Sequence, residues 1–442
     1  MLNKIISIVL TFLLCLTFCS CNSNSASLNI FDDANYLIEN ASNLKEDDIL
    51  YAYVDITLNE ADEIISEMFN CTKKEARNKI LKEGLKIYTY CNKNTISAMQ
   101  KTYDEMGNRF DFGCALTNLN GNLVAAFSGS KNSTSNFAAN KTQPHSAFKP
   151  LSVYAPAVEN KIINWSSQYE DSPYKKLKDE NGIERDWPSN ASNSYYKKPI
   201  LIYDAIKESL NTVAVKCLSD LGVGNSIKFL EENFDITLDY EKYHLSMSGD
   251  DEVIGNIALG STQMGVSPVD MAGYYQIFAN GGFYSSPKAI KKIVNKNGEA
   301  IYENNTEAKK VISSETAYIM QELLKGVVAP GGTGQDAFVK GIEIAGKTGT
   351  GDNNKDNWFV GTTPDFSCAV WHSEVGTVNI AASLFSGIVK ELEVKNKSFA
   401  TNNNVSKRIY CTESGKLFKA GCKKIDLGYY ANNNLPEKCD LH

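Results

Sequence analysis

The chain has 442 residues, 43% of them hydrophobic, which is enough to bury one large core together with a smaller one. Its formal net charge is -7, and Lys and Glu are spread along the chain without a basic run, which argues against nucleic acid as a partner. The four histidines (His145, His244, His372 and His442) are too scattered to suggest a metal site, so we expect no metal and no cofactor.

The first residues predict a targeting segment. Lys4 precedes an apolar run from Ile5 to Phe18, which is shorter than the ~20 residues of a membrane-spanning helix, so a secretory signal is favoured. Leu16-Thr17-Phe18-Cys19-Ser20-Cys21 resembles a bacterial lipobox, although a phenylalanine and a cysteine replace the usual aliphatic and small residues. We therefore expect residues 1–21 to be a signal peptide with lipobox and Cys21 to carry lipid. Ordinary cleavage and an uncleaved anchor are the alternatives.

Residues 22–108 predict an accessory linker region without chemistry of its own. Ala61 to Phe69 is apolar at helical spacing, and the capping box Thr72-x-x-Glu75 predicts a second helix that ends at Gly84. Leu85 to Tyr90 predicts a strand. A packing module or stalk is the favoured interpretation.

The main domain, which we place at residues 109–393, opens with a predicted hairpin. Phe112 to Leu119 and Leu123 to Phe127 flank Asn120-Gly121, a dipeptide typical of a type I′ turn. Farther along, Asp171 to Lys198 is rich in Asn, Ser, Lys and Tyr, and predicts a surface excursion that could wall a cleft.

The stretch Pro144-His145-Ser146-Ala147-Phe148-Lys149-Pro150 places a hydroxyl three residues before an amine. If a helix begins at Ser146, this spacing stacks the hydroxyl and the Lys149 amine on one face, one turn apart. A serine needs a neighbouring base to act as a nucleophile, and a desolvated neutral lysine can be that base. Taken alone, the pair more often is a helix cap followed by a solvated lysine.

Two further pieces follow in order, Ser209-Leu210-Asn211 and Lys347-Thr348-Gly349-Thr350. Asp204 to Leu221 is helix-forming on both sides of Ser209, yet residues two apart do not share a helix face. For Ser209 and Asn211 to reach one site, the chain must leave the helix there. A helix cap followed by a polar surface position is the alternative.

The Lys347 motif has a β-rich approach, because Phe338 to Ala345 predicts a strand that runs into it. Lys347 and Gly349 would face one way, and Thr348 and Thr350 the other. Gly349 would let another backbone come close, so a substrate could pair with this edge. The glycine cluster Gly331-Gly332-Thr333-Gly334 lacks the context of a phosphate loop and predicts a turn.

Helices at Ser314 to Val328 and Asn379 to Leu392 and a hairpin of Trp358 to Thr362 with Phe366 to Trp371 complete the main domain. The Asn-rich tail, residues 394–442, is expected to be mobile except around Cys411 and Cys422. Eight of the 11 cysteines lie beyond Cys21, and an exported protein could pair them. Cys411 and Cys422 flank a short loop and are the best disulfide candidates, whereas Cys114 and Cys368 lie in apolar runs and are expected to be buried thiols.

The trio of motifs is found in penicillin-binding proteins and serine β-lactamases. From roughly Asp55 to Gly428 the chain resembles the transpeptidase half of bifunctional, class A penicillin-binding proteins. Besides the trio, the resemblance rests on five stretches: Gly84-Leu85-Lys86-Ile87-Tyr88-Thr89, Trp187-Pro188-Ser189-Asn190, Ala258-Leu259-Gly260, Phe278-Ala279-Asn280-Gly281-Gly282 and Trp358-Phe359-Val360-Gly361-x-x-Pro364-Asp365.

The resemblance implies an α/β (α+β) fold of the serine DD-peptidase and β-lactamase type, with a central antiparallel sheet between helical layers. It implies a peptidoglycan D,D-transpeptidase that cross-links stem peptides through an acyl-serine and is inhibited by β-lactams. Ser146 would attack the penultimate D-alanine carbonyl, Lys149 would be the base, and Ser209 would pass the proton to the leaving amine.

The remaining site residues would hold the substrate. Asn211 would hold the donor backbone, and Lys347, Thr348 and Thr350 would grip its terminal carboxylate beside Gly349. Backbone N–H groups of Ser146 and Thr350 would form the oxyanion hole. The protein would act on the outer face of the cytoplasmic membrane, held there by its N-terminal anchor.

Two departures from the family pattern matter. The ~30 residues between Cys21 and Asp55 cannot hold a glycosyltransferase domain, so a separate glycosyltransferase is an expected partner. His145 replaces the glycine usual before the nucleophile, and histidine tolerates positive φ better than a branched residue. A DD-carboxypeptidase, a β-lactamase, a penicillin sensor and a non-catalytic scaffold remain as alternatives.

Overall fold

The structure is a computed structural model that describes residues 28–39, 41–45, 48–178, 182–234, 236, 251–260, 265–351, 354–373 and 378–442. The predicted signal peptide and the Cys21 lipidation site lie outside these ranges. Within them, no helix is both long enough and apolar enough to cross a membrane.

A five-stranded antiparallel sheet with strand order β13-β14-β15-β3-β4 forms the centre of the molecule. Every residue of β14 and β15 is buried, because helices cover both faces of the sheet. β13 is an edge strand, so one of its sides has no strand partner in the sheet. The strand bounds are β3 (Phe112–Asn118), β4 (Leu123–Gly129), β13 (Ala345–Thr350), β14 (Asn357–Thr362) and β15 (Phe366–His372).

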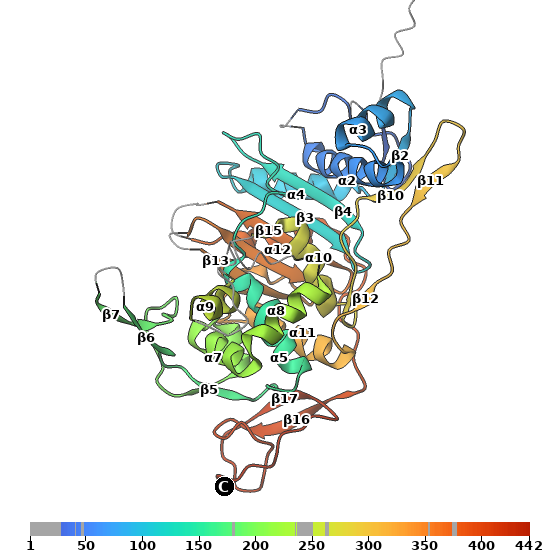
Figure 1. Cartoon of the computed structure of the whole chain (residues 1–442). Coiled ribbons are helices and arrows are strands. Elements are labelled where there is room, and N and C mark those ends of the chain that lie inside the picture. The colour runs from blue at the N-terminus through green and yellow to red at the C-terminus, as the bar shows by residue number, and fades with distance from the viewer. Residues whose placement is uncertain are drawn as a thin grey trace, which may run out of the picture.

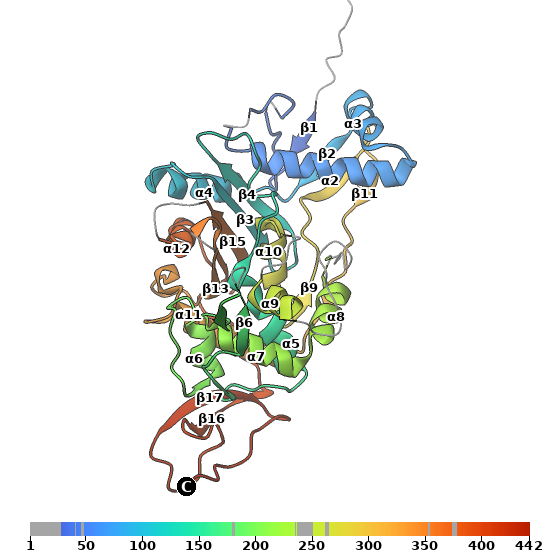
Figure 2. The ribbon, with the colours of Figure 1, turned by 60° about the vertical axis from the view of Figure 1, so that its left-hand side comes forward.

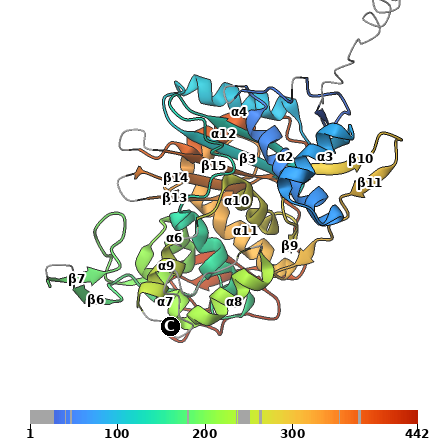
Figure 3. The ribbon, with the colours of Figure 1, turned by 45° about the horizontal axis from the view of Figure 1, so that its top comes forward.

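Helices α4 (Lys93–Glu105) and α12 (Ala381–Glu391) pack against each other and against one face of this sheet. On the other face α10 (Pro268–Tyr275) crosses the middle strands, and α11 (Ser314–Val328) packs along β13 (Figure 3). Ser267 caps α10 and Ser313 caps α11 through their hydroxyl oxygens. The predicted central antiparallel sheet between helical layers is confirmed.

A second, helical half lies beside the β13 end of the sheet, and Figure 2 shows its helices below the strands. Its centre is the continuous helical run that follows Ser146, which changes from 3₁₀ to π to α geometry and is buried throughout its π turn. Its elements are η1 (His145–Phe148), η2 (Pro150–Tyr154), α5 (Ala155–Glu159), α6 (Ile202–Lys207), α7 (Asn211–Leu221), α8 (Val223–Asn233) and α9 (Asp251–Leu259).

The predicted surface excursion, residues 171–198, contains the antiparallel pair of β6 with β7, which projects from the body in Figure 1. The antiparallel pair of β5 with β8 joins the two ends of the excursion. The bounds are β5 (Gln168–Glu170), β6 (Lys175–Lys178), β7 (Glu184–Trp187) and β8 (Pro199–Leu201). The main domain also contains two short 3₁₀ helices, η3 (Gln276–Phe278) and η4 (Gln335–Ala337), and a two-stranded sheet of β9 (Phe283–Tyr284) with β12 (Lys309–Lys310).

The accessory region contains the predicted helices and strand, including the capping box in which Thr72 and Glu75 exchange hydrogen bonds. Its elements are β1 (Asn29–Phe31), α2 (Tyr51–Phe69), α3 (Lys73–Lys82) and β2 (Lys86–Thr89). β1 and β2 share a four-stranded sheet with β10 (Ile290–Val294) and β11 (Ala300–Glu303). Strands from both sides of the predicted boundary at residue 108 therefore pair with each other.

Three local predictions were wrong. The β3–β4 turn is not type I′, because Gly121 (φ 82°) has positive φ but Asn120 does not. The Gly121 N–H instead bonds to the Asn118 carbonyl at 3.1 Å, and the register shifts between Leu116 and Thr117. These are the features of a three-residue loop with a bulge, which an Asn-Gly pair also permits.

The second wrong prediction is the strand before Lys347, and the third is the mobility of the tail. Residues 338–344 lie outside β13, and only an isolated bridge joins Val339 to Ile342. The tail was expected to be mobile outside its cysteine loop, but it forms a seven-residue antiparallel hairpin of β16 (Val405–Cys411) and β17 (Ile425–Ala431). The hairpin packs against α11, where the Tyr429 ring centroid lies 5.8 Å from that of Tyr318, and against Trp165, whose ring centroid lies 5.1 Å from that of Tyr429.

Candidate active site

A cavity of about 560 Å³ opens between the β13 edge of the sheet and the helical half. Five of the predicted site residues line it, namely Ser146, Ser209, Asn211, Thr348 and Thr350. Lys149 and Lys347 are fully buried, and both bond to Ser209, which lines the cavity. The fold thus brings together three motifs that lie about 60 and 140 residues apart in the chain. Their chemical roles stay predictions.

Ser146 lies in η1, a 3₁₀ turn rather than the expected regular α-helix. In a 3₁₀ helix side chains at i and i+3 eclipse each other, so Ser146 and Lys149 are stacked more directly than α geometry would allow. The preceding residue, His145, has φ 48°, so this position does require the left-handed region. The His145 N–H bonds to the Gly260 carbonyl at 3.1 Å and fixes the start of the turn.

Gly349 explains how η1 comes so close to β13. A Cβ atom at this position would overlap the Pro144 carbonyl oxygen and lie 3.1 Å from the Ala147 Cβ. The expected close approach of another backbone is made by the Ser146 turn, and pairing of a substrate with this edge stays a prediction. Gly349 therefore positions Ser146 against the strand.

Ser209 lies between α6 and α7 with φ 61°, so the chain leaves the helix there, as the two-residue spacing of Ser209 and Asn211 required. A serine in the left-handed region is strained. Lys149 Nζ donates to the Ser209 carbonyl oxygen at 3.0 Å and to Asn211 Oδ1 at 2.6 Å. Lys347 Nζ donates to Ser209 Oγ at 2.8 Å and to the Thr348 carbonyl at 3.2 Å.

Burial shifts the pKa of both amines. It lowers the pKa of Lys149 well below its usual range, and the nearby charge of Lys347 lowers this pKa further. Burial also lowers the pKa of Lys347 to about 7. A neutral amine one turn from a serine hydroxyl can accept its proton, so the arrangement can activate Ser146 as a nucleophile.

Asn211 is held by a network that sequence reasoning missed. The Asn190 side-chain oxygen accepts the N–H groups of Asn211 (2.9 Å) and Thr212 (3.4 Å), and so caps α7, which has no capping side chain at Leu210. The Asn190 amide donates at 2.8 Å to buried Asp171, which also accepts the Thr212 hydroxyl at 2.5 Å. The resemblance drew attention to the Trp187–Asn190 stretch, but nothing in it signalled a cap for a distant helix.

Two further residues support β13. Thr348 Oγ1 donates to Thr333 Oγ1 at 2.8 Å, so the glycine cluster forms a turn, as predicted, that also supplies a side chain to the cavity. Asn379 Nδ2 donates to the Gly349 carbonyl and to Thr350 Oγ1, both at 2.9 Å. Asn379 follows no motif in the sequence and could not have been found there.

The cysteines of the described residues are all free thiols. Cys114 and Cys368 are buried with their sulfurs 3.7 Å apart, which agrees with the expectation of buried thiols. Cys411 and Cys422 are unpaired in the structure, and their predicted disulfide stays a prediction.

Comparison with known proteins identifies the family to which the chain belongs. A family model described as the penicillin-binding protein transpeptidase domain matches residues 92–388. Penicillin-binding protein 1A of Clostridium acetobutylicum is 29% identical over 402 residues, which cover 86% of this chain and 47% of that protein. Penicillin-binding protein 1A of Clostridium botulinum strain Hall is 32% identical over 354 residues, which cover 73% of this chain and 41% of that protein. The chain thus spans about half the length of these curated relatives.

Solved structures share the fold. The PonA1 protein of Mycobacterium tuberculosis in complex with penicillin V has a TM-score of 0.62 at 21% identity, with 78% of this chain and 95% of that chain covered. The D,D-transpeptidase domain of a peptidoglycan glycosyltransferase from Eggerthella lenta has a TM-score of 0.58 at 20% identity, with 72% of this chain and 86% of that chain covered.

Proposed function

Since the chain belongs to the penicillin-binding protein transpeptidase family, whose members are serine acyl-transferases or peptidases, we propose that it is a peptidoglycan D,D-transpeptidase with Ser146 as its nucleophile. One observation carries the proposal. Two buried lysines, both with lowered pKa, converge on Ser209 beside a serine that is one 3₁₀ turn from one of them.

Acylation would use the neutral amine of Lys149. Ser146 Oγ attacks the carbonyl of the penultimate D-alanine while its proton passes to Lys149. The bond from that carbonyl carbon to the terminal D-alanine nitrogen breaks, and Ser209 Oγ passes a proton to the leaving amine and regains one from Lys149, which becomes neutral again. Backbone N–H groups of Ser146 and Thr350 stabilise the oxyanion. In the second step an acceptor amine attacks the ester carbonyl and gives up a proton to Lys149, the bond from the carbonyl carbon to Ser146 Oγ breaks, and Ser146 takes that proton back from Lys149.

The substrate would bind along β13, whose outer side has no strand partner in the sheet. Lys347 and the hydroxyls of Thr348 and Thr350 would hold the terminal carboxylate, and a carboxylate would in turn favour the charged form of Lys347. Asn211, fixed by Asn190, would hold the donor backbone. β-Lactams would enter the same site and acylate Ser146.

The physiological setting is also part of the proposal. A transpeptidase works on peptidoglycan outside the cytoplasmic membrane, with the chain held by its N-terminal segment and glycan strands supplied by a separate glycosyltransferase. The main domain would span residues 109–393, preceded by the accessory region and followed by the hairpin that carries Cys411 and Cys422.

The test is an incubation of the purified chain with a stem peptide that ends in D-Ala-D-Ala and with a labelled amine acceptor. We expect a cross-linked product and released D-alanine, both lost in Ser146→Ala. Release of D-alanine without cross-linking would identify a carboxypeptidase. Acylation by a fluorescent penicillin without turnover of the peptide would identify a sensor, and no reaction with either reagent would identify a scaffold.

A further inference from the structure

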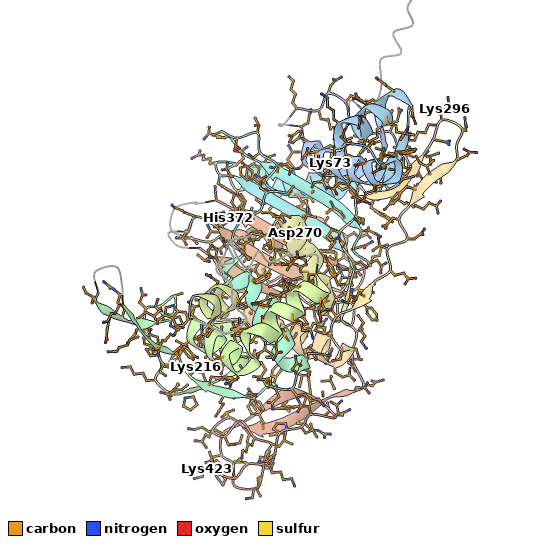
Figure 4. All side chains as sticks on the ribbon, in the orientation of Figure 1. Lys73, Lys216, Asp270, Lys296, His372 and Lys423 are labelled. Carbon is orange, nitrogen blue, oxygen red and sulfur yellow. The ribbon has the colours of Figure 1, made fainter. Side chains whose placement is uncertain are left out.

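The strongest unexplained group of side chains lies in the tail, far from the cavity. Cys411 ends β16, Cys422 precedes β17, and Cys439 and His442 follow the hairpin. In Figure 4, Lys423, which is next to Cys422, lies at the opposite end of the molecule from Lys73 in the accessory region. The Ser146 mechanism uses none of these four residues.

Backbone pairing brings the four residues together. Leu417 bridges Tyr410 on one side and Lys438 on the other. The Leu417 N–H bonds to the Glu437 carbonyl, and the Cys439 N–H bonds to the Leu417 carbonyl, each at 2.8 Å. The segment that carries Cys439 and His442 therefore lies beside the loop between Cys411 and Cys422. Cys422 and Cys439, which follow Cys411 by 11 and 28 residues, therefore lie close to it.

The ligand atoms of Cys411, Cys422, Cys439 and His442 all lie within 4.8 Å of one another. His442 Nδ1 is 3.3 Å from the Cys439 sulfur and 3.8 Å from the Cys411 sulfur. A tetrahedral zinc ion with Zn–S of about 2.3 Å and Zn–N of about 2.0 Å places sulfur and nitrogen ligands about 3.5 Å apart, between the two observed distances. The spacing of the group fits that ion.

The surroundings of the group are those of a metal site. The other imidazole nitrogen of His442, Nε2, lies 3.2 Å from a Glu413 carboxylate oxygen. A carboxylate behind a ligating histidine fixes the ring so that the free nitrogen lone pair points at the metal. The Ser414 hydroxyl donates to the Cys439 sulfur at 3.3 Å, which would stabilise a thiolate.

We propose that Cys411, Cys422, Cys439 and His442 bind one Zn²⁺ ion in a closed structural site. Each thiol gives up its proton to solvent and binds as a thiolate, and the imidazole binds as the neutral ring, so nothing is oxidised or reduced. Four protein ligands leave no open position for a substrate, which separates this site from a catalytic one. The scattered histidines concealed the site in the sequence, because cysteines supply three of its ligands.

The ion would supply the cross-link that the tail otherwise lacks. Several large apolar side chains around the hairpin are exposed, among them Phe418, Leu427 and Leu435, so the tail buries little core of its own. A disulfide between Cys411 and Cys422 is the rival arrangement. It would close one loop but leave Cys439 and His442 without a role, whereas the zinc ion ties the segment after β17 to the loop before it.

The test is the metal content of the full chain, purified without a histidine tag and measured by inductively coupled plasma mass spectrometry. We expect one zinc per chain in the parent and in the control Cys71→Ser, whose thiol lies elsewhere in the chain. Cys439→Ser and His442→Ala should lose most of it. Replacing the ion by Co²⁺ should give the visible absorption of a tetrahedral thiolate complex in the parent and in Cys71→Ser.

Far-UV circular dichroism shows whether each variant is folded, and metal contents are compared only between variants whose main domain remains folded. If both cluster variants unfold, the Co²⁺ spectrum of the parent decides the question alone. A chain that binds neither zinc nor Co²⁺ after reduction would overturn the proposal. So would a Cys411–Cys422 disulfide in the metal-free exported protein, found by non-reducing peptide mapping, or zinc retained in Cys439→Ser.

Discussion

Lys149 and Lys347 meet at Ser209, the first through the Ser209 carbonyl oxygen at 3.0 Å and the second through the Ser209 hydroxyl at 2.8 Å. Both amines are buried, and the charge of Lys347 helps to keep the pKa of Lys149 low. Two ammonium groups in one dry site disfavour each other, so the site favours the loss of a proton from one of the two amines. The proposed base, Lys149, lies one turn from Ser146, and its lowered pKa favours the neutral form that this role requires.

The pH dependence of acylation should be bell-shaped. The rate rises with pH as Lys149 loses its proton and falls as Lys347, with a pKa of about 7, loses the charge that holds a carboxylate. Lys347→Ala should abolish the alkaline limb. It should also move the acid limb to higher pH, because the pKa of Lys149 rises when its cationic neighbour is gone. The second-order rate constant with a carboxylate-free ester measures the acid limb, and an unchanged limb would contradict the coupling.

Two replacements of Ser209 should distinguish the effect of losing its hydroxyl on acylation from the effect of its backbone strain on stability. Ser209→Ala and Ser209→Gly both remove the hydroxyl and should reduce acylation similarly. Only glycine adopts φ 61° without cost, so Ser209→Gly should be more stable than Ser209→Ala by about 1 kcal/mol. Denaturant unfolding measures this difference, and equal stability of the two variants would show that Ser209 is not strained.

Asn190→Ala should damage both the fold and the site. It removes the cap of α7 and leaves the Asp171 carboxylate short of a donor, which should cost about 2–3 kcal/mol of unfolding free energy. Because Asn211 loses its anchor, the affinity for a stem peptide should also fall at temperatures where the variant is folded. Ser192→Ala, an exposed neighbour, is the control. Normal peptide affinity in folded Asn190→Ala would limit Asn190 to a structural role.

The raised pKa of Glu60, in the accessory region, predicts that the free energy of unfolding depends on pH. Burial on α2 raises its pKa from 4.5 to about 7, against hydrogen bonds from the N–H groups of Ala289 (2.7 Å) and Ile290 (3.4 Å). The folded chain therefore binds this proton more tightly than the unfolded chain, so stability falls as pH rises from 4.5 to 7 and is level above.

Glu60→Gln should remove a pH-dependent change of about 1–3 kcal/mol over that interval. The measurement is the difference between parent and variant in unfolding free energy at several pH values, which cancels the titration of all other groups. A difference that does not vary between pH 4.5 and 7 would contradict the raised pKa.

Local chemistry explains what the sequence could predict. The Ser209–Asn211 break and the Thr72–Glu75 capping box depend on neighbours within a few residues, and both have their expected geometry. The helical turn at Ser146 was also predicted from local spacing, although it is a 3₁₀ turn rather than the expected α-helix. The hairpin of β14 and β15 and the helix α11 follow from apolar runs long enough to be unambiguous.

What could not be predicted depends on residues far apart in the chain. Asn190 caps a helix that begins 21 residues later, and Asn379 bonds to a strand 29 residues earlier. Cys439 and His442 reach Cys411 only because the chain turns back past Leu417. Asn120-Gly121 suits more than one turn type, so the dipeptide alone could not determine the turn.

The most direct test of the central claim compares Lys149→Ala with Lys347→Ala by the rate at which Ser146 is acylated, followed by intact-protein mass. Lys228→Ala, an exposed lysine on α8, is the matched control, and the reagents are a penicillin and a carboxylate-free ester. Lys149→Ala should hardly react with either reagent, even at saturation, because no base remains. Lys347→Ala should lose affinity mainly for the penicillin. Equal losses in all four combinations, or rapid acylation of Lys149→Ala, would contradict the separate roles of the two lysines.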